Sequence, residues 1–301
     1  MALFNPADIQ PSPAPRRLAV AAAEDETVLS AAAQAYAHGL AVPILCGSRE
    51  KIRAIAETFN IDIAPFELVD CPSPRAAVAA AVSLVRENRA DVLMKGLVQT
   101  ADLLRAVLDR DSGLRGEGVL SHVSVLDSPI LKRRFLLTDA AMVTYPDLKT
   151  KAALIKNAVR AAQGLGIQNP KVAVIAPVEV VNPDMPATLD AAALTAMNRR
   201  GQITGCVVDG PLAMDLALSE EAARHKGVAS DVAGRADILL VHNIDAGNAT
   251  LKAFTHGGGC LFGGLVMGAK APIVLNSRSD TDASKLFSIS CAEAVSRLGQ
   301  A

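Results

Sequence analysis

The chain has 301 residues, of which 50% are hydrophobic, and its formal charge is -1 because 30 lysines and arginines oppose 31 acids. Such a balance excludes a strong overall field toward nucleic acid or an anionic membrane surface. An aromatic content of only 3% also disfavours a protein that stacks single-stranded bases on its rings. The length is that of about two domains, at ~100–200 residues each.

Short apolar runs alternate with longer helical patterns in the first part of the chain, which predicts repeated strand–helix units. Strands are expected at residues 18–22, 42–46, 66–69 and 92–94. Helices are expected at residues 25–38, 49–59, 73–88 and 100–109, the last of them capped by Thr100. Because parallel strands need helical crossovers, we expect a mostly parallel sheet with helices packed on it.

The rhythm changes between residues 116 and 137, where two strand-like runs, 119–126 and 134–137, predict an antiparallel pair. Alternation then resumes, with strands expected at residues 172–175, 203–208, 238–241 and 273–275. Helices are expected at residues 148–163, 187–199, 212–223, 248–254 and 282–298. Asp209-Gly210-Pro211 is interpreted as a turn, and the glycine-rich residues 257–264 as close packing or a turn, since they match no nucleotide-loop motif.

The cysteines and histidines predict neither disulfides nor a metal centre. The five cysteines, which are Cys46, Cys71, Cys206, Cys260 and Cys291, form no C-x-x-C pair and indicate reduced thiols in a cytosolic protein. No histidine shares ligand spacing with another, so no metal is expected. The longest uncharged apolar stretch, residues 257–269, is too short for a membrane span of ~20 residues.

The segment Asn276-Ser277-Arg278-Ser279-Asp280 follows the last predicted strand and precedes a helix. Ligands of open α/β sheets bind outside the carboxyl ends of the strands. A guanidinium offers a planar fork of donors that matches phosphate, and the N–H groups of a helix N-terminus favour an anion. The pattern therefore indicates a phosphate site, and a solvated helix cap remains the alternative.

Two further segments carry polar side chains after predicted strands. Lys95, Thr100 and Arg105 could converge on another phosphate, or Arg105 could simply cover the helix surface. Asp245 and Asn248 follow a strongly apolar strand and could cap the next helix, contact a ligand, or do both.

A set of short motifs occurs in a definite order and spacing. They are Lys95-Gly96 with Thr100–Arg105, Val208–Leu212, His225–Gly227, Val232–Leu240, Ile244–Asn248 and Pro272–Arg278. Together they resemble the phosphate acetyltransferase/phosphate butyryltransferase family, more closely its butyryltransferase-like branch. The resemblance covers about residues 16–300.

The resemblance implies a two-domain α/β/α architecture like that of isocitrate and isopropylmalate dehydrogenases, with the active site in the interdomain cleft. The first domain would comprise residues 1–121 and 277–301, and the second residues 122–276. The implied reaction is acyl-CoA + phosphate ⇌ acyl phosphate + CoA, with coenzyme A as a substrate and no cofactor or metal. A cytoplasmic homodimer or larger homo-oligomer, with no nucleic-acid or membrane partner, completes the expectation.

By the resemblance, Ser277 and Arg278 match a Ser-Arg pair at the reacting phosphate and thioester, and Arg105 matches an arginine for substrate phosphate or CoA. We expect Thr100, Lys95, Asp245 and Asn248 to add substrate and CoA contacts. The acetyltransferase branch has a catalytic Asp seven positions after the serine, where this chain has Ser284. Asp280 and Asp282 are the neighbouring candidates for a base, and the alternative is that no carboxylate acts as one.

The chemistry itself reduces the need for a base. Phosphate, with a second pKa near ~6, is largely dianionic at pH 7, and a thiol with a pKa of about 8.5 leaves readily as a thiolate. The principal task is to hold two anions together and to stabilise the carbonyl oxyanion. Two alternatives remain open: a metal- and NAD(P)-dependent decarboxylating hydroxyacid dehydrogenase on the same fold, and a non-catalytic acyl-CoA sensor.

Overall fold

The computed structural model describes residues 4–6, 12, 14–116, 118–277 and 280–299. The contacts among them define two compact units, which we call the terminal unit (residues 4–118 with 261–299) and the central unit (residues 119–260). The predicted boundaries lay after residues 121 and 276. The chain joins the terminal unit already at Leu261, because the two strands that follow this residue pair with each other and the second of them pairs with the N-terminal strand at residues 92–95.

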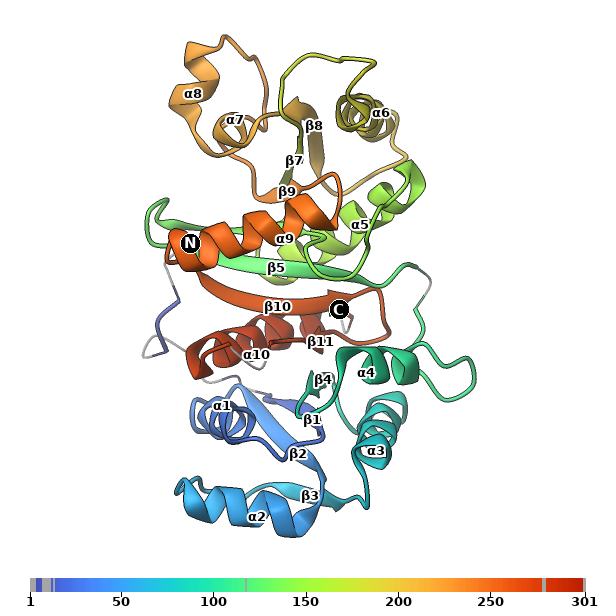
Figure 1. The fold of residues 1–301 in the computed structure, drawn as a ribbon, viewed down its shortest axis with the longest axis vertical. Coiled ribbons are helices and arrows are strands. Elements are labelled where there is room, and N and C mark those ends of the chain that lie inside the picture. The colour runs from blue at the N-terminus through green and yellow to red at the C-terminus, as the bar shows by residue number, and fades with distance from the viewer. Residues whose placement is uncertain (1–3, 7–11, 13, 117, 278–279, 300–301) are drawn as a thin grey trace. The chain divides into compact units, whose positions relative to one another are not determined.

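The terminal unit is built on strands in the order β3-β2-β1-β4-β11-β10, all paired in parallel except the antiparallel pair β10–β11. These strands are β1 (Arg16–Ala21), β2 (Ala41–Gly47), β3 (Glu67–Asp70), β4 (Val92–Lys95), β10 (Leu261–Met267) and β11 (Ile273–Val274). Its helices are α1 (Glu26–Ala37), α2 (Arg49–Thr58), α3 (Pro74–Arg86), α4 (Thr100–Val107), α10 (Asp282–Ser296) and the 3₁₀ turn η3 (Arg297–Gly299). Helix α10, red in Figure 1, packs beside the blue helix α1.

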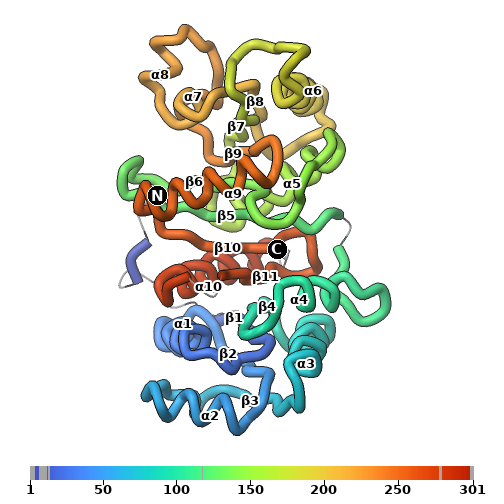
Figure 2. Tube along the Cα trace, in the orientation of Figure 1, coloured from blue at the N-terminus to red at the C-terminus, as the bar shows by residue number. Residues whose placement is uncertain are grey.

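The central unit has strands in the order β5-β6-β9-β7-β8, and Figure 2 shows β7 between β8 and β9. The strands are β5 (Ser121–Ser128), β6 (Arg133–Thr138), β7 (Lys171–Ile175), β8 (Val207–Leu212) and β9 (Ile238–Leu240). The helices are α5 (Leu148–Gly164), α6 (Pro186–Arg199), α7 (Met214–Leu218), α8 (Glu220–His225), α9 (Ile244–Lys252) and the π-helical turn η2 (Ala253–Gly257). The predicted antiparallel pair β5–β6 is confirmed, and β6, β9, β7 and β8 pair in parallel.

Side-chain caps fix where many of these helices begin. An oxygen of the residue before the helix accepts a backbone N–H of the first turn at Asp25, Ser48, Ser73, Asp147 and Thr281. Such caps satisfy donors that have no partner inside the helix. The prediction that Thr100 caps α4 is wrong. Thr100 is the first residue of this helix, and Gln99 occupies the cap position without a side-chain hydrogen bond.

The predicted turn at Asp209-Gly210-Pro211 is wrong, since all three residues lie inside β8. Strand β8 begins at Val207 rather than at residue 203, after Gly205 with its φ of 76°. Proline removes a donor and is tolerated in edge strands. Strand β8 stands at the edge of the central unit's sheet and pairs only with β7 among the described strands, so Pro211 fits there.

Two helices in the central unit also differ from the prediction. The expected helix 212–223 is divided into α7 and α8, because Ser219 leaves the helical conformation and caps α8 through the N–H of Ala222. Helix α9 begins at Ile244 rather than at residue 248, because the side chain of Asn243 accepts the N–H of Ala246 and starts the helix earlier.

The glycine-rich run proves to be partly a strand, since β10 begins at Leu261. Close packing explains its glycines: a Cβ on Gly263 would lie 3.1 Å from the ring of Phe287. The N–H of Gly264 donates to Ser288 Oγ at 3.0 Å. Gly263 thus allows α10 to lie close against β10, in agreement with the predicted close packing.

Arg17 and Asp91 join the start of β1 to the residue before β4. The guanidinium Nε and Nη2 donate to the two carboxylate oxygens at 3.0 and 2.9 Å, and the Arg17 backbone N–H donates to Asp91 Oδ2 at 2.8 Å. Burial acts to raise the pKa of Asp91, but the hydrogen bonds and charge of Arg17 outweigh it and lower that pKa.

We expect Asp91→Asn to lower the free energy of unfolding by about 1 kcal/mol at pH 7, a small value because Arg17 is partly exposed and water screens the pair. A carboxyl with a lowered folded pKa stabilises the protein above its unfolded pKa of ~3.9, and this contribution is lost as the pH falls through the folded pKa. Urea unfolding of both proteins between pH 7 and pH 3 would measure it. A difference that grows toward acid would contradict the expectation.

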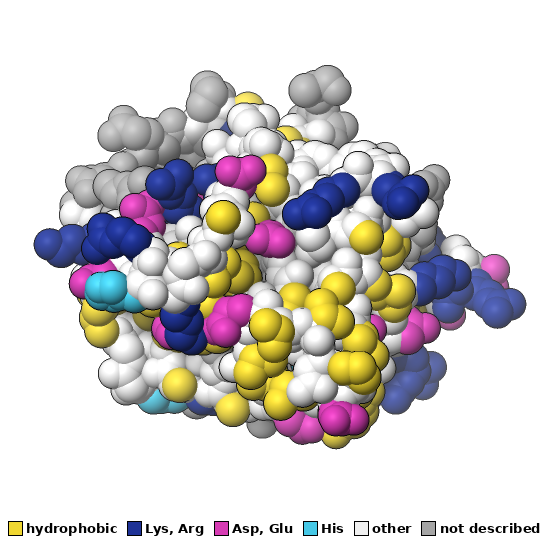
Figure 3. Space-filling model, turned by 90° about the horizontal axis from the view of Figure 1, so that it is seen from above, with side chains coloured by type: hydrophobic (Ala, Val, Ile, Leu, Met, Phe, Trp, Pro, Cys, Tyr) yellow, Lys and Arg dark blue, Asp and Glu magenta, His cyan; other side chains and the backbone are white. Residues whose placement is uncertain are grey.

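Part of the central unit's surface is apolar. In Figure 3, hydrophobic side chains gather on the lower part of the face, with lysines and arginines toward its borders. In the loop between β7 and α6, Val180 and Val181 are 66% and 55% exposed, so this loop presents apolar surface at the carboxyl end of β7.

No helix among the described residues is long and apolar enough to cross a membrane.

Candidate functional site

The loop after β11 is held by Asp280. Its Oδ2 accepts the backbone N–H of Ser277 at 2.8 Å and the side-chain N–H of Asn276 at 3.1 Å. The Asp280 carbonyl in turn accepts the ammonium of Lys285, which is 3% exposed. Arg278 and Ser279 lie outside the described residues. The carboxylate of Asp280 thus fixes Asn276 and the candidate Ser277 after β11.

The second candidate base, Asp282, has another structural role. It is the first residue of α10, and its Oδ2 accepts the hydroxyl of Ser30 on α1 at 2.9 Å. Thr281 caps the helix through the N–H of Ser284. Asp282 therefore ties two helices of the terminal unit together, and Ser284, at the position where a base was sought, contributes its backbone to the cap.

Asn276 belongs to the Pro272–Arg278 motif, and its sequence pattern indicates no role for it. Its side chain is 6% exposed, and its Oδ1 is buried with no hydrogen-bond partner among the described residues. A buried acceptor without a partner is costly. The alternation of strand and cap residues gives no signal for this feature, because it depends on which groups the fold places around the amide.

Lys95, Thr100 and Arg105 come from one strand end and one helix. The ammonium of Lys95, at the end of β4, is buried and donates to the carbonyl of Gly96 at 3.4 Å. Arg105 is on the exposed face of α4, where its guanidinium donates to Asp102 Oδ1 at 2.6 Å. Its side chain is 76% exposed, so the guanidinium is open to solvent and to an anionic ligand.

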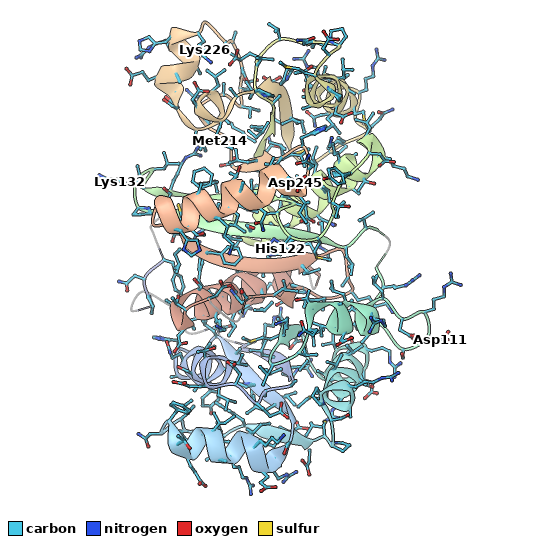
Figure 4. All side chains as sticks on the ribbon, viewed as in Figure 1. Asp111, His122, Lys132, Met214, Lys226 and Asp245 are labelled. Carbon is cyan, nitrogen blue, oxygen red and sulfur yellow. The ribbon has the colours of Figure 1, made fainter. Side chains whose placement is uncertain are left out.

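Asp245 and Asn248 lie on α9 in the central unit, where Figure 4 labels Asp245. The hydroxyl of Tyr145 donates to Asp245 Oδ2 at 2.7 Å, and this hydrogen bond raises the pKa of Tyr145. Asn248 Nδ2 donates to the carbonyl of Ala140 at 3.1 Å. Neither residue caps α9, which Asn243 does, and both instead fix the helix to the loop that follows β6.

Sequence reasoning missed a buried lysine in the central unit. Lys151 on α5 is 2% exposed, and its Nζ lies 2.5 Å from Asp190 Oδ2 on α6 and 2.9 Å from His242 Nδ1 after β9. The three residues are far apart in the sequence, so no spacing could reveal them. Among the described residues there is no group of three or more His, Cys, Asp or Glu that could hold a metal ion.

Comparison with known proteins places the chain in a family. The model of the phosphate acetyl/butaryl transferase family matches residues 7–77 and 73–292. The chain belongs to the phosphate acetyl/butyryl transferase family. It is 49% identical over 280 residues to a phosphate butyryltransferase of Clostridium acetobutylicum, covering 93% of each chain.

The family also includes proteins named phosphate acetyltransferase. A phosphate acetyltransferase of Thermotoga maritima is 42% identical over 274 residues, which cover 91% of this chain and 93% of that one. Among solved structures, a branched-chain phosphotransacylase from Enterococcus faecalis V583 has a TM-score of 0.83 and 33% identity, over 93% of this chain and 99% of the other. The resemblance found from the sequence motifs is confirmed, and the chain is an acyltransferase of this family.

Proposed function

We propose that the protein catalyses the reversible transfer of an acyl group between coenzyme A and inorganic phosphate, with a preference for butyryl over acetyl. The observation that carries this proposal is the 49% identity, over 93% of each chain, to a phosphate butyryltransferase. A second phosphate butyryltransferase, from Clostridium beijerinckii, is 48% identical over 280 residues. The identity to the Thermotoga maritima acetyltransferase is lower, at 42%.

In this proposal, Arg278 holds the attacking phosphate and stabilises the oxyanion that forms at the thioester carbonyl, beside Ser277. The planar guanidinium can bind two phosphate oxygens at once. Positioning and charge stabilisation are the main catalytic terms for two anionic substrates. The hydrogen bond from the Ser277 N–H to Asp280 supports the role of Ser277, because it fixes the backbone of that residue.

The occupied carboxylates support a mechanism without a general base. Asp280 already accepts hydrogen bonds from Asn276 and Ser277, and Asp282 accepts one from Ser30. Phosphate is largely dianionic at neutral pH and can attack directly. The departing thiolate needs little protonation, so positioning and charge stabilisation can account for the transfer without a general base.

Coenzyme A carries phosphate groups that need cations. Arg105 is the most suitable of the expected CoA contacts, since its guanidinium is largely exposed and only partly neutralised by Asp102. Lys95 would act from within the terminal unit, through the positive charge at the end of β4. Thr100, Asp245 and Asn248 complete the set proposed to contact the substrates.

The proposed arrangement is two α/β/α domains of the isocitrate and isopropylmalate dehydrogenase type with the active site between them, in a cytoplasmic homodimer that uses no metal or cofactor. A likeness of fold to a solved structure supports the α/β/α architecture in this proposal. A 4-hydroxythreonine-4-phosphate dehydrogenase from Klebsiella pneumoniae has a TM-score of 0.59 over 94% of this chain at 13% identity. At such identity the likeness concerns the fold alone.

Thioester formation tests the proposed function. The purified protein is mixed with CoA and either butyryl phosphate or acetyl phosphate, without Mg²⁺ or nicotinamide, and the absorbance of the thioester is followed. We expect formation with both, and a higher kcat/KM with butyryl phosphate. No turnover but measurable binding of CoA would support the acyl-CoA sensor instead, and a higher kcat/KM for acetyl phosphate would overturn the butyryl preference.

A further inference from the structure

His242 occupies a place in the central unit where α/β sheets bind ligands. Strand β9 ends at Leu240, and His242 follows two residues later, before the cap residue Asn243. In the sheet, β9 lies between β6 and β7 and is consecutive in the chain with neither. Ligands of such sheets bind outside the carboxyl ends of the strands, at places where the chain order changes direction.

Lys151 determines how the imidazole of His242 is oriented. Its Nζ is 2.9 Å from His242 Nδ1 and 2.5 Å from Asp190 Oδ2, while His242 Nδ1 and Asp190 Oδ2 are 3.9 Å apart. The lysine side chain is 2% exposed, and that of His242 is 37% exposed. One end of the imidazole is therefore bonded to a buried ammonium, and a substantial part of the side chain reaches the surface.

The chemistry of the two groups fixes the tautomer. An ammonium has only donors, so His242 Nδ1 accepts from Lys151 and the ring proton must be on Nε2. Burial lowers the pKa of His242, the charge of Lys151 lowers it further, and the charge of Asp190 opposes both. The lowered pKa favours the neutral ring, in which Nε2–H is a donor.

We propose that His242 is a substrate-binding residue whose Nε2–H donates a hydrogen bond to a phosphoryl oxygen of a substrate, and that Lys151 is the positioning residue that holds it in this tautomer. This inference rests on the proposed function, because it takes its ligand from the reaction of phosphate with acyl-CoA. The phosphoryl group is that of phosphate or acyl phosphate, or one of the phosphates of CoA.

Two features favour a phosphoryl oxygen over another acceptor. The buried charge of Lys151 polarises the imidazole, and a hydrogen bond backed by a cation is stronger toward an anionic acceptor. The dipole of α9, which begins two residues after His242 at Ile244, adds a weaker attraction for an anion. The N–H groups of Ile244 and Ala246 already donate to Thr144 and Asn243, so they are not offered to the ligand. The carboxylate of Asp245, in the first turn of α9, repels an anion, and it accepts a hydrogen bond from the Tyr145 hydroxyl.

Nitrogen-15 NMR of the histidine rings in the whole protein tests the inference directly. His242 is assigned with the His242→Gln variant, and the exposed His256 provides an internal control. We expect the Nε2–H tautomer for His242 at pH 7, and a shift of its Nε2 signal when inorganic phosphate or CoA is added. A shift with phosphate assigns the donor to phosphate or acyl phosphate, and a shift with CoA alone assigns it to a CoA phosphate. An Nδ1–H tautomer, or no shift with either ligand, would overturn the inference.

Kinetics of matched variants give an independent result. His242→Ala is expected to raise the KM of the phosphoryl substrate that it contacts about tenfold with kcat changed less than threefold, the size expected for one hydrogen bond to a charged group. His242→Gln should recover part of the loss, because its amide N–H can take the place of Nε2–H. The control His256→Gln should match the wild type. Equal KM values in His242→Ala and the wild type would refute the role.

The failure of the inference and that of the proposed function are distinguishable. If the wild-type protein forms no thioester, the proposed reaction is wrong, and the NMR titration still reports whether His242 binds a phosphoryl group. If the wild type is active and His242 neither shifts nor affects KM, only the inference fails. Lys151→Met adds a test of positioning, since we expect it to give a mixture of tautomers wherever the variant remains folded.

Discussion

An Arg278→Ala enzyme is expected to lose about a hundredfold to a thousandfold in kcat for thioester formation. The guanidinium is proposed to bind the phosphate and the oxyanion at once, and removal of a single preorganised donor to an oxyanion costs an enzyme a factor of this size. Arg278→Lys should restore only part of the activity, because a point charge lacks the planar fork. Steady-state rates with butyryl phosphate and CoA measure both.

The matched control is the neighbouring carboxylate. Asp282→Asn removes the charge of a candidate base and keeps an oxygen that can accept the Ser30 hydroxyl, so we expect kcat within about threefold of the wild type. A near-normal rate in Arg278→Ala would remove Arg278 from the reaction. A loss in Asp282→Asn as large as that in Arg278→Ala would show that a base is needed after all.

Gly96→Ala is expected to destabilise the terminal unit by about 3 kcal/mol. A Cβ at this position would lie 2.1 Å from the carbonyl oxygen of Ala22 and 2.7 Å from that of Ala21. The N–H groups of Gly96 and Leu97 donate to these same two carbonyls. The backbone therefore cannot move away without breaking the hydrogen bonds that join the end of β1 to the end of β4.

Gly118→Ala is the control, since no heavy atom lies within 4 Å of its added Cβ. Urea unfolding monitored by circular dichroism compares the two variants with the wild type. We expect Gly118→Ala to unfold within about 0.5 kcal/mol of the wild type, as surface substitutions usually do. Equal midpoints for Gly96→Ala and Gly118→Ala would show that the close approach of the two strands is not what requires a glycine at position 96.

The parts of the fold that follow from local chemistry could be predicted from the sequence. Strands β1 and β4 are continuous apolar runs because they are buried on both faces of a parallel sheet. Helices α1 and α5 begin at Asp25 and Asp147, whose carboxylates cap them. In each case the residues that decide the element are next to it in the chain.

Features that depend on contacts between distant residues could not be predicted. Strand β10 has a weak apolar pattern because it carries glycines where α10 lies close, and only the position of Phe287 makes this clear. Pro211 signals a turn locally and is tolerated because β8 is an edge strand. The pairing of Lys151 with Asp190 and His242 joins residues of α5, α6 and the end of β9, which the fold alone brings together.

The buried cysteines can report unfolding of the protein through their reactivity. All five thiols are buried, and burial raises the pKa of Cys46 to about 12 and that of Cys206 to about 11. Since the thiolate is the reactive form, a thiol reagent should modify either residue only after local or global unfolding. Cys46 belongs to the terminal unit and Cys206 to the central unit. Their separate labelling rates, read by mass spectrometry, would report how often each half of the chain unfolds, without any introduced probe.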